Sequence, residues 1–244
     1  MSKSIGVFGA GPGLGRAVAY RYARAGYDVV LVARRQDALE RLAGDLRRDL
    51  AGALPDGAAV HVLAADLSDT AAVPGLAEQI RAQVGHLDAL YYAPTPGSGF
   101  VPAVDLTAQR ARDYMPLIFY TLLDLVAQFL PHMLEQGDGG ILTAQGASTL
   151  HGLPAMSGSG PAQAAQRNYL QSLHAEVGGK GVYVGMLYVG AVIEDSAFHA
   201  WTTAAGEGTT RDWGPTVDPD HLADLLWTMH NAKSPTEARY PRGA

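Results

Sequence analysis

The chain lacks cysteine entirely, and its 18 basic residues are nearly all arginine, with lysine only at Lys3, Lys180 and Lys233. Without cysteine, the protein has no disulfides, no thiolate metal sites and no cysteine nucleophile. Such a composition fits a reducing compartment. We therefore expect a cytoplasmic protein.

Long apolar runs and an excess of positive charge are also missing. The net charge is −6, whereas nucleic acids and anionic membranes need a concentrated basic face. The longest apolar run, 182–193, contains two glycines and is well below the roughly 20 residues that span a bilayer. The N-terminus enters a glycine-rich segment too early for a secretory signal. The expected partner is a small molecule, with no nucleic acid and no membrane.

Hydrophobic residues make up 48% of the chain, and they fall into alternating patterns. Short apolar runs predict strands at Ser4–Phe8, Asp28–Ala33, Ala59–Ala64, Leu87–Tyr92, Gly140–Ala144 and Gly181–Tyr188. Amphipathic spacing predicts helices at Gly13–Ala25, Gln36–Leu50, Asp69–Val84, Asp105–Glu135, Pro161–Val177 and Asp218–Ala232. This βα alternation predicts an α/β fold with a Rossmann-type, doubly wound parallel sheet in three layers.

Two irregular segments interrupt the pattern, at 94–102 and 194–219. Neither has the composition of a disordered linker, so we expect one domain over 1–244. Ligands of open α/β sheets bind beyond the carboxyl ends of the strands, where both segments begin. They are the candidate walls of a pocket, with 194–219 as a substrate-binding lid.

A glycine-rich turn follows the first predicted strand and opens the first helix. Its residues are Gly9, Gly11, Pro12, Gly13, Leu14 and Gly15. The glycines at 9, 13 and 15 allow positive φ and a close approach of backbone to ligand. The helix N-terminus adds free N–H groups and a positive dipole end, which suit a pyrophosphate. With a strand before it and a helix after it, this turn predicts a dinucleotide site.

The second strand ends in Arg34 and Arg35. An enzyme whose cofactor has a free ribose 2′-hydroxyl would carry Asp or Glu at this position. Two guanidinium groups suit a 2′-phosphate instead, so NADP(H) is expected rather than NAD(H). Asp66 and Leu67 end the third strand. Asp66 either contacts the adenine or caps the next helix, and residue type alone does not decide between these roles.

These features resemble the short-chain dehydrogenase/reductase (SDR) family over nearly the whole chain to about Glu194. Further matching segments are Leu87–Leu90, Leu130–Met133 with Gly139–Leu142, Ala164–Ala165 and Ser172–Glu176. The resemblance implies about seven strands, a dinucleotide that also contacts Ala93 and Pro94, and a homodimer or homotetramer. In the family, the helices that correspond to Asp105–Glu135 and Pro161–Val177 form the subunit interface. The apolar Leu117, Ile118, Leu122, Leu125, Val126 and Phe129 favour the same interface here.

The catalytic Asn, Ser, Tyr and Lys of the family do not carry over. Aligning the neighbouring matches puts Pro116, Gly146, Ser159 and Gln163 at their positions, and no YxxxK motif occurs anywhere in the chain. A serine hydroxyl is a far weaker acid than a phenol, and a glutamine supplies no positive charge. Since general acid catalysis contributes about 10²–10⁴-fold, another group would have to donate the proton.

Polar groups near the same sheet edge are the candidate replacements. The catalytic candidates are Tyr92, Ser148, His151 and Tyr188, and each is equally interpretable as a pocket-lining residue. An apolar pocket is predicted from Tyr92, Phe100, Tyr120, Tyr188 and Trp201. Glu194, Asp195 and His199 match no strong metal pattern, so no metal is expected.

Three functions follow from this sequence. The first is an NADP(H)-dependent oxidoreductase that acts on a small hydrophobic carbonyl, alcohol or enone with a non-standard active site. The second keeps the fold without redox chemistry, as a cyclase, dehydratase, isomerase or binding protein. The third is a non-catalytic partner subunit.

Overall fold

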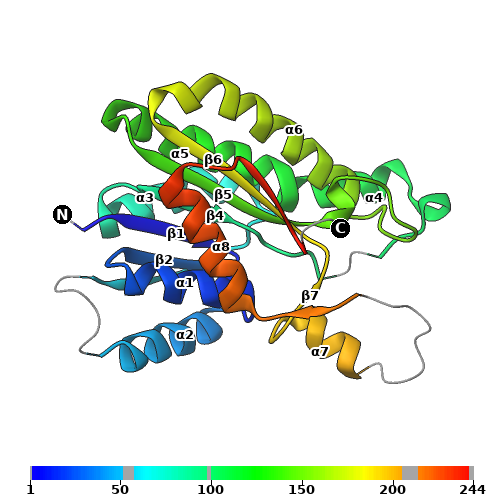
Figure 1. Ribbon diagram of the computed structural model, residues 1–244, viewed down its shortest axis with the longest axis horizontal. Helices are drawn as coiled ribbons and strands as arrows, with labels where there is room; N and C mark the ends of the chain where they lie inside the picture. The colour runs from blue at the N-terminus through cyan, green and yellow to red at the C-terminus, as the bar shows by residue number, and fades with distance from the viewer. Residues whose placement is uncertain (1, 52–57, 98–99, 205–213, 242–244) are drawn as a thin grey trace.

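The computed structural model describes residues 2–51, 58–97, 100–204 and 214–241 (Figure 1). Its centre is a seven-stranded sheet in the order β3-β2-β1-β4-β5-β6-β9, and every neighbouring pair is parallel. The strands are β1 (Ser4–Phe8), β2 (Asp28–Ala33), β3 (Val60–Ala64), β4 (Ala89–Tyr92), β5 (Gly139–Gly146), β6 (Val182–Val189) and β9 (Glu237–Tyr240). The doubly wound parallel sheet is thus confirmed.

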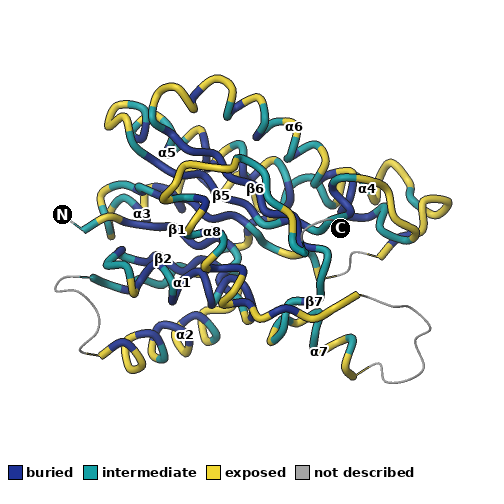
Figure 2. The backbone as a smooth tube through the Cα atoms, viewed as in Figure 1, coloured by how far each residue is buried: buried dark blue, intermediate teal, exposed yellow. Residues whose placement is uncertain are grey.

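Helices cover both faces of the sheet, which makes three layers (Figure 1). One face carries α1 (Leu14–Arg24), α2 (Gln36–Asp49) and α8 (Pro219–Ala232), and the other carries α3 (Val73–Val84), α5 (Thr121–Gln136) and α6 (Gly160–Val177). Figure 2 shows the strands as the buried centre, with exposed residues on the outer sides of the helices. The apolar strands are therefore enclosed on both faces, as their unbroken hydrophobic sequences predict.

The winding of the chain reverses between β1 and β4, which are neighbours in the sheet. Open α/β sheets bind ligands at such a switch point, beyond the carboxyl ends of the strands. Gly9 follows β1 and Ala93 follows β4. A Cβ atom at Gly9 would lie 2.9 Å from the Pro94 nitrogen, so the two strand ends meet directly.

The long helix expected at 105–135 is divided into α4 (Ala108–Met115), a π-helical turn (Pro116–Tyr120) and α5. The segment Ala108–Gln136 is long and apolar enough to cross a membrane, but 39% of its most apolar window is buried within the protein. Ile118, Leu122, Leu125, Val126 and Phe129 all pack inside the chain. These five residues therefore offer no exposed apolar surface to a partner, because the fold already buries them, and the subunit interface stays a prediction.

Four elements, β9 and the three between β6 and α8, were not located from the sequence. The edge strand β9 is held by Arg167 of α6, whose guanidinium donates to both carboxylate oxygens of Glu237 at 3.2 and 2.9 Å. After β6, the strands β7 (Val192–Ile193) and β8 (Thr216–Val217) form a small parallel pair, with α7 (Ala197–Ala204) between them in sequence. Part of the predicted lid, 205–213, lies outside the described residues.

Candidate cofactor and substrate site

The glycine-rich turn has an open backbone at the switch point. Gly9 and Gly13 have φ values of +97° and +77°, which side chains rarely adopt. A Cβ atom at Gly15 would lie 2.2 Å from the Gly9 carbonyl oxygen, so only glycine allows this turn to close. The Arg16 N–H donates to the Gly11 carbonyl at 2.9 Å and the Ala17 N–H to the Gly13 carbonyl at 3.1 Å. The N–H groups of Leu14 and Gly15 begin the helix and have no carbonyl one turn before them within α1, so they are the candidate anion donors.

The end of β2 brings two guanidinium groups beside this turn. Arg34 and Arg35, the N-cap residue of α2, are both exposed. Hydrogen bonds from the Ser68 backbone and hydroxyl lower the pKa of Asp66, and the nearby charge of Arg34 lowers it further. Asp66 therefore closes a turn with Ser68, whereas Asp69 caps the following helical turn, so the predicted helix-capping role does not belong to Asp66. Its neighbour Leu67 is buried, and its carbonyl accepts a 2.7 Å hydrogen bond from Thr121.

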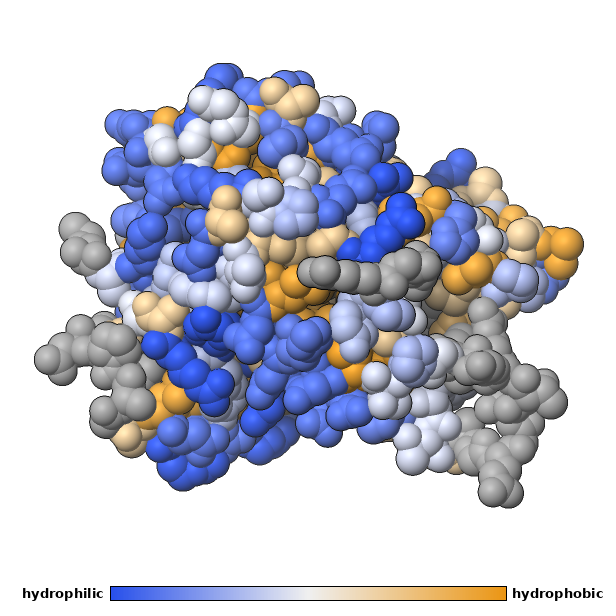
Figure 3. Space-filling view, viewed as in Figure 1, coloured by the Kyte–Doolittle hydropathy of each residue, from blue (hydrophilic) through white to orange (hydrophobic). Residues whose placement is uncertain are grey.

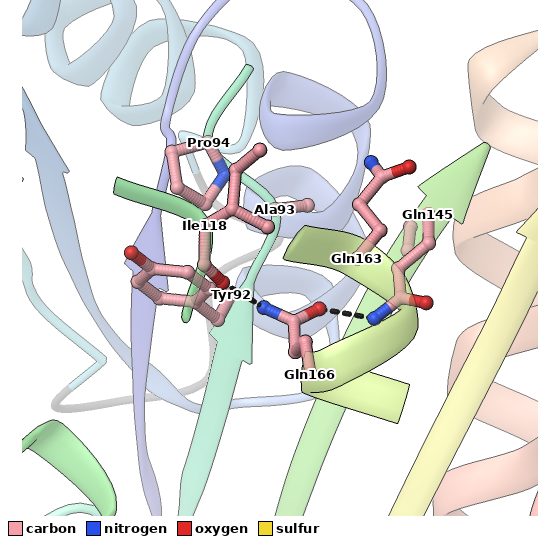
Figure 4. A pocket seen from close by; sticks show the side chains of 8 residues that line it. Tyr92, Ala93, Pro94, Ile118, Gln145, Gln163 and Gln166 are labelled. Atoms are coloured by element: carbon pink, nitrogen blue, oxygen red, sulfur yellow. Dashed lines mark hydrogen bonds between the residues drawn. The ribbon is translucent and has the colours of Figure 1, made fainter. Parts of the chain in front are cut away.

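Beyond β4, a polar cavity of about 10 Å³ lies among Ala93, Pro94, Ile118 and three glutamines (Figure 4). This volume holds about one water molecule. Gln145 of β5 donates to Gln166 of α6, and Gln166 donates to the Ile118 carbonyl in the π-helical turn. The amide chain joins three elements, so it fixes the floor of the site without any charge.

Gln163 forms the upper wall of this cavity. Its amide oxygen accepts a hydrogen bond from the Thr149 hydroxyl at 3.3 Å, and the side chain extends away from Gln166 (Figure 4). Ser159 lies one turn earlier and is buried at the N-cap of α6. Neither residue brings an ionisable group to the site. Among the residues that line the cavity, only Tyr92 is titratable.

The structure does not support the two tyrosines as proton donors. The Tyr92 hydroxyl donates to the Leu117 carbonyl, and burial raises the pKa of Tyr92 well above its usual value. Tyr188 is buried beneath α6, where its hydroxyl lies 3.1 Å from Arg167 Nε. Burial raises the pKa of Tyr188 as well. Both phenols point into the protein and are already committed to protein partners.

The other two candidates lie together. Ser148 and His151 line a hollow of about 340 Å³ between the segment after β5 and the first turn of α6. The hydroxyl of Ser148 is buried without a hydrogen-bond partner, and it lies 3.3 Å from where a Cβ atom at Gly146 would be. The hollow adjoins the small cavity, because Thr149 lines the hollow and binds Gln163.

The predicted aromatic pocket divides into three places. Phe100 and Trp201 stack with their ring centres 5.8 Å apart, which joins the 94–102 segment to α7. Tyr92 and Tyr188 are core residues, and Tyr120 is exposed on the π-helical turn. At the start of the predicted lid, Ser196 lies against the glycine turn, since a Cβ atom at Gly13 would be 3.1 Å from the Ser196 Cβ.

The cluster Glu194, Asp195 and His199 does not form a metal site. The Asp195 N–H donates to Nδ1 of His199 at 3.2 Å, which occupies that nitrogen. Across the described ranges, no group of three or more histidine, aspartate or glutamate side chains is placed to hold a metal.

Comparison with known proteins decides the family. A model described as short chain dehydrogenase matches residues 3–202. The chain belongs to the short-chain dehydrogenase family. A fatty acyl-CoA reductase from Acinetobacter baylyi is 28% identical to it over 223 residues, which cover 90% of this chain and 70% of that protein. The chain spans 62% of the length of the uncharacterized mycobacterial oxidoreductases that it also matches.

Solved structures share the fold of this short-chain dehydrogenase. L-sorbose reductase from Gluconobacter frateurii, complexed with NADPH and L-sorbose, superposes with a TM-score of 0.82 at 22% identity, covering 98% of this chain and 95% of that one. An oxidoreductase from Pseudomonas aeruginosa PAO1, described as containing an atypical catalytic center, gives 0.84 at 21% identity, covering 99% and 98%. At these identities the likeness concerns the fold alone.

Sequence reasoning missed the amide chain of this short-chain dehydrogenase. Gln145 and Gln166 are 21 positions apart, and each is a polar residue inside an otherwise buried face. Buried polar groups need partners, so an isolated glutamine in an apolar strand was the one available signal.

Proposed function

We propose that this short-chain dehydrogenase binds NADP(H) and acts as an oxidoreductase on a small hydrophobic carbonyl, alcohol or enone, with a non-standard active site. The observation that carries the proposal is the open glycine turn at the β1–β4 switch point, with Arg34 and Arg35 at the end of the neighbouring strand. L-sorbose reductase, a structural neighbour, was crystallised with NADPH.

The residues fit the cofactor in two ways. The cradle at Gly9, Gly13 and Gly15 has no room for a side chain and faces the N-terminus of α1, as a pyrophosphate requires. The guanidinium groups can pair with a 2′-phosphate. We assign Gly11, Pro12 and Leu14 to the same turn, Asp66 and Leu67 to the adenine side, and Ala93 and Pro94 to the switch point. The bound cofactor supplies or accepts the hydride.

The proton for a carbonyl oxygen then comes from the hollow. With the phenols of Tyr92 and Tyr188 engaged elsewhere, Ser148 and His151 are the remaining candidates. Histidine is a common general acid in enzymes, and the unpartnered Ser148 hydroxyl suits a donor to the substrate oxygen. In this assignment Ser159 and Gln163 shape the site but move no proton.

The absence of YxxxK supports a second candidate function, in which the protein binds cofactor or ligand without redox turnover, as a cyclase, dehydratase, isomerase or partner subunit. One experiment separates the two. NADPH is added to the pure protein, its binding is measured, and the absorbance of the reduced nicotinamide is followed with a panel of ketones, aldehydes and enones. Consumption supports the oxidoreductase, and tight binding without consumption supports the alternative.

We extend the proposal to the organisation of the chain. Residues 1–244 form one domain whose 194–219 segment acts as a lid, since Ser196 and Phe198 bring this segment to the glycine turn and to Phe100. We also propose a cytoplasmic location, which the absence of cysteine fits, and a homodimer or homotetramer, which the resemblance to the family implies. Light scattering at micromolar concentration tests the assembly, and a monomer would contradict it.

A further inference from the structure

Exposed apolar side chains gather on one side of this molecule. Within the described ranges, five large hydrophobic residues are exposed: Phe100, Val104, Tyr120, Leu153 and Trp201. All except Tyr120 belong to three segments that meet beyond the carboxyl edge of the sheet. Figure 3 shows apolar surface on the side of the molecule where α4 lies, next to these segments. Contiguous exposed apolar surface marks an interaction site more often than scattered residues do.

Backbone and ring contacts join these segments into one rim. The Ser157 N–H donates to the Val101 carbonyl at 3.1 Å, and Val101 pairs with Met156 in an isolated β-bridge. On the other side, the rings of Phe100, Phe198 and Trp201 contact one another with centres 5.7 to 5.8 Å apart. Val104 is 93% exposed, three residues after Val101. We call Phe100, Val104, Leu153, Phe198 and Trp201 the apolar rim.

The rim continues into the hollow of about 340 Å³. Leu153 belongs to both, and Met156 lines the hollow while pairing with the rim segment. The remaining apolar lining is Leu150, Pro161 and Ala164, and the polar groups are three hydroxyls and His151. None of the described residues that line the hollow is an aspartate, glutamate, lysine or arginine. This described lining suits a ligand that is apolar along its length and uncharged.

The inner end of the hollow is polar. Ser148 contributes a buried hydroxyl without a partner, and Thr149 separates the hollow from the cavity beside Pro94 and Gln163. An unpartnered buried hydroxyl costs free energy until a ligand or water bonds to it. The geometry points to a substrate with an uncharged carbonyl or hydroxyl head near Ser148 and an alkyl or aryl chain that runs over Leu153 onto the apolar rim. This inference rests on the proposed function and gives its substrate a shape.

A homologous series of ligands tests this shape without requiring turnover. Straight-chain 2-alkanones of increasing length, from about five to nine carbons, are titrated into the full chain by calorimetry. Each methylene that leaves water contributes about 0.8 kcal/mol, so the dissociation constant should fall by up to about fourfold per added carbon. The change in affinity with chain length measures the contact of the alkyl chain with the apolar rim. The affinity that all members of the series share measures the binding of the carbonyl head.

Variants separate the contribution of the apolar rim from that of the carbonyl head. Trp201→Ala and Leu153→Ser should flatten the series, so that the longest ketone loses roughly tenfold or more while the shortest is unchanged. Ser148→Ala should weaken every member by a similar factor, roughly fivefold, because it removes one hydrogen bond of about 1 kcal/mol. Tyr120→Ala is the matched control, because Tyr120 is an equally exposed aromatic residue outside the rim. Thermal unfolding checks that each variant is folded.

A flat series in the wild type would overturn the inference, and so would a Tyr120→Ala variant that flattens it as much as Trp201→Ala does. NADPH titrations of the same proteins keep the two proposals apart. A steep ketone series without NADPH binding would leave the inference standing and refute the proposed function. NADPH binding with a flat ketone series would refute the inference and leave the proposed function standing.

Discussion

The two ends of the crevice differ in what they retain. At the β1–β2 end, the glycine turn is open, the helix N-terminus faces outward and two guanidinium groups stand at the strand end. At the β5–α6 end, Gly146, Ser159 and Gln163 are the residues that we align by sequence with the family's Ser, Tyr and Lys, and three glutamines line the cavity. We infer from this contrast that nucleotide binding and proton transfer depend on separate residues, so that the first can be retained while the second is rebuilt.

The largest expected effect is the loss of NADPH binding at the glycine turn. Gly13→Val should lower NADPH affinity more than roughly a hundredfold, because a β-branched residue resists the +77° φ angle and meets Ser196. Gly85→Val is a matched control: Gly85 has the same φ of +77°, but no other atom lies within 4 Å of its added Cβ. The control should lose stability and keep NADPH binding. Equal loss of binding in both variants, measured by titration, would refute the placement of the cofactor.

The next effect concerns the rebuilt end. If His151 is the general acid, His151→Ala should lower kcat by about a hundredfold, the low end for such a group. His221→Ala removes an exposed histidine from α8, outside the site, and should leave kcat unchanged. Steady-state kinetics on a ketone that the wild type consumes provide the measurement. An unchanged kcat in His151→Ala would move the role to Ser148 or to bound water.

A pH effect outside both ends must be separated from catalysis. Burial lowers the pKa of His230 to about 4, and its ring packs between Tyr22 and Tyr183 with Nδ1 2.8 Å from the Tyr22 hydroxyl. The unfolded chain binds a proton near pH 6.5 and the folded chain does not. Stability is therefore full above pH 6.5 and falls by at most about 3 kcal/mol as the pH drops to 4. Denaturant unfolding should show this loss, and His230→Gln should reduce it.

The smallest effects belong to the two residues at the family's Tyr and Lys positions. Ser159→Ala and Gln163→Ala should each lower kcat by less than about tenfold, or 1.4 kcal/mol, because neither group is acidic or charged. A kinetic comparison at one pH is sufficient. If Ser159→Ala removed activity while NADPH still bound, Ser159 would be a catalytic group and the description of a rebuilt end would be wrong.

The sequence predicted the fold well for strands that are buried on both faces, because burial makes their sequences apolar throughout. Unbroken apolar runs located six of the seven strands, but β9 has only the four residues Glu237–Tyr240, and its charged pattern resembles a loop. The tyrosines failed for a related reason. Strands enclosed on both faces are apolar throughout, so alternation does not tell which way Tyr92 or Tyr188 points. The glutamine chain depends on contacts across three elements, which spacing along one strand cannot reveal.

The most direct test of the account is an equilibrium titration of NADPH and NADH into the wild type and Arg34→Ala, with Arg41→Ala as control. Arg41 is an exposed arginine of α2 that pairs with Asp37 at 2.8 Å, away from the strand end. We predict that the wild type binds NADPH at least roughly tenfold more tightly than NADH, a difference of about 1.4 kcal/mol, and that only Arg34→Ala loses the preference. Equal affinities for the two nucleotides in the wild type would contradict it.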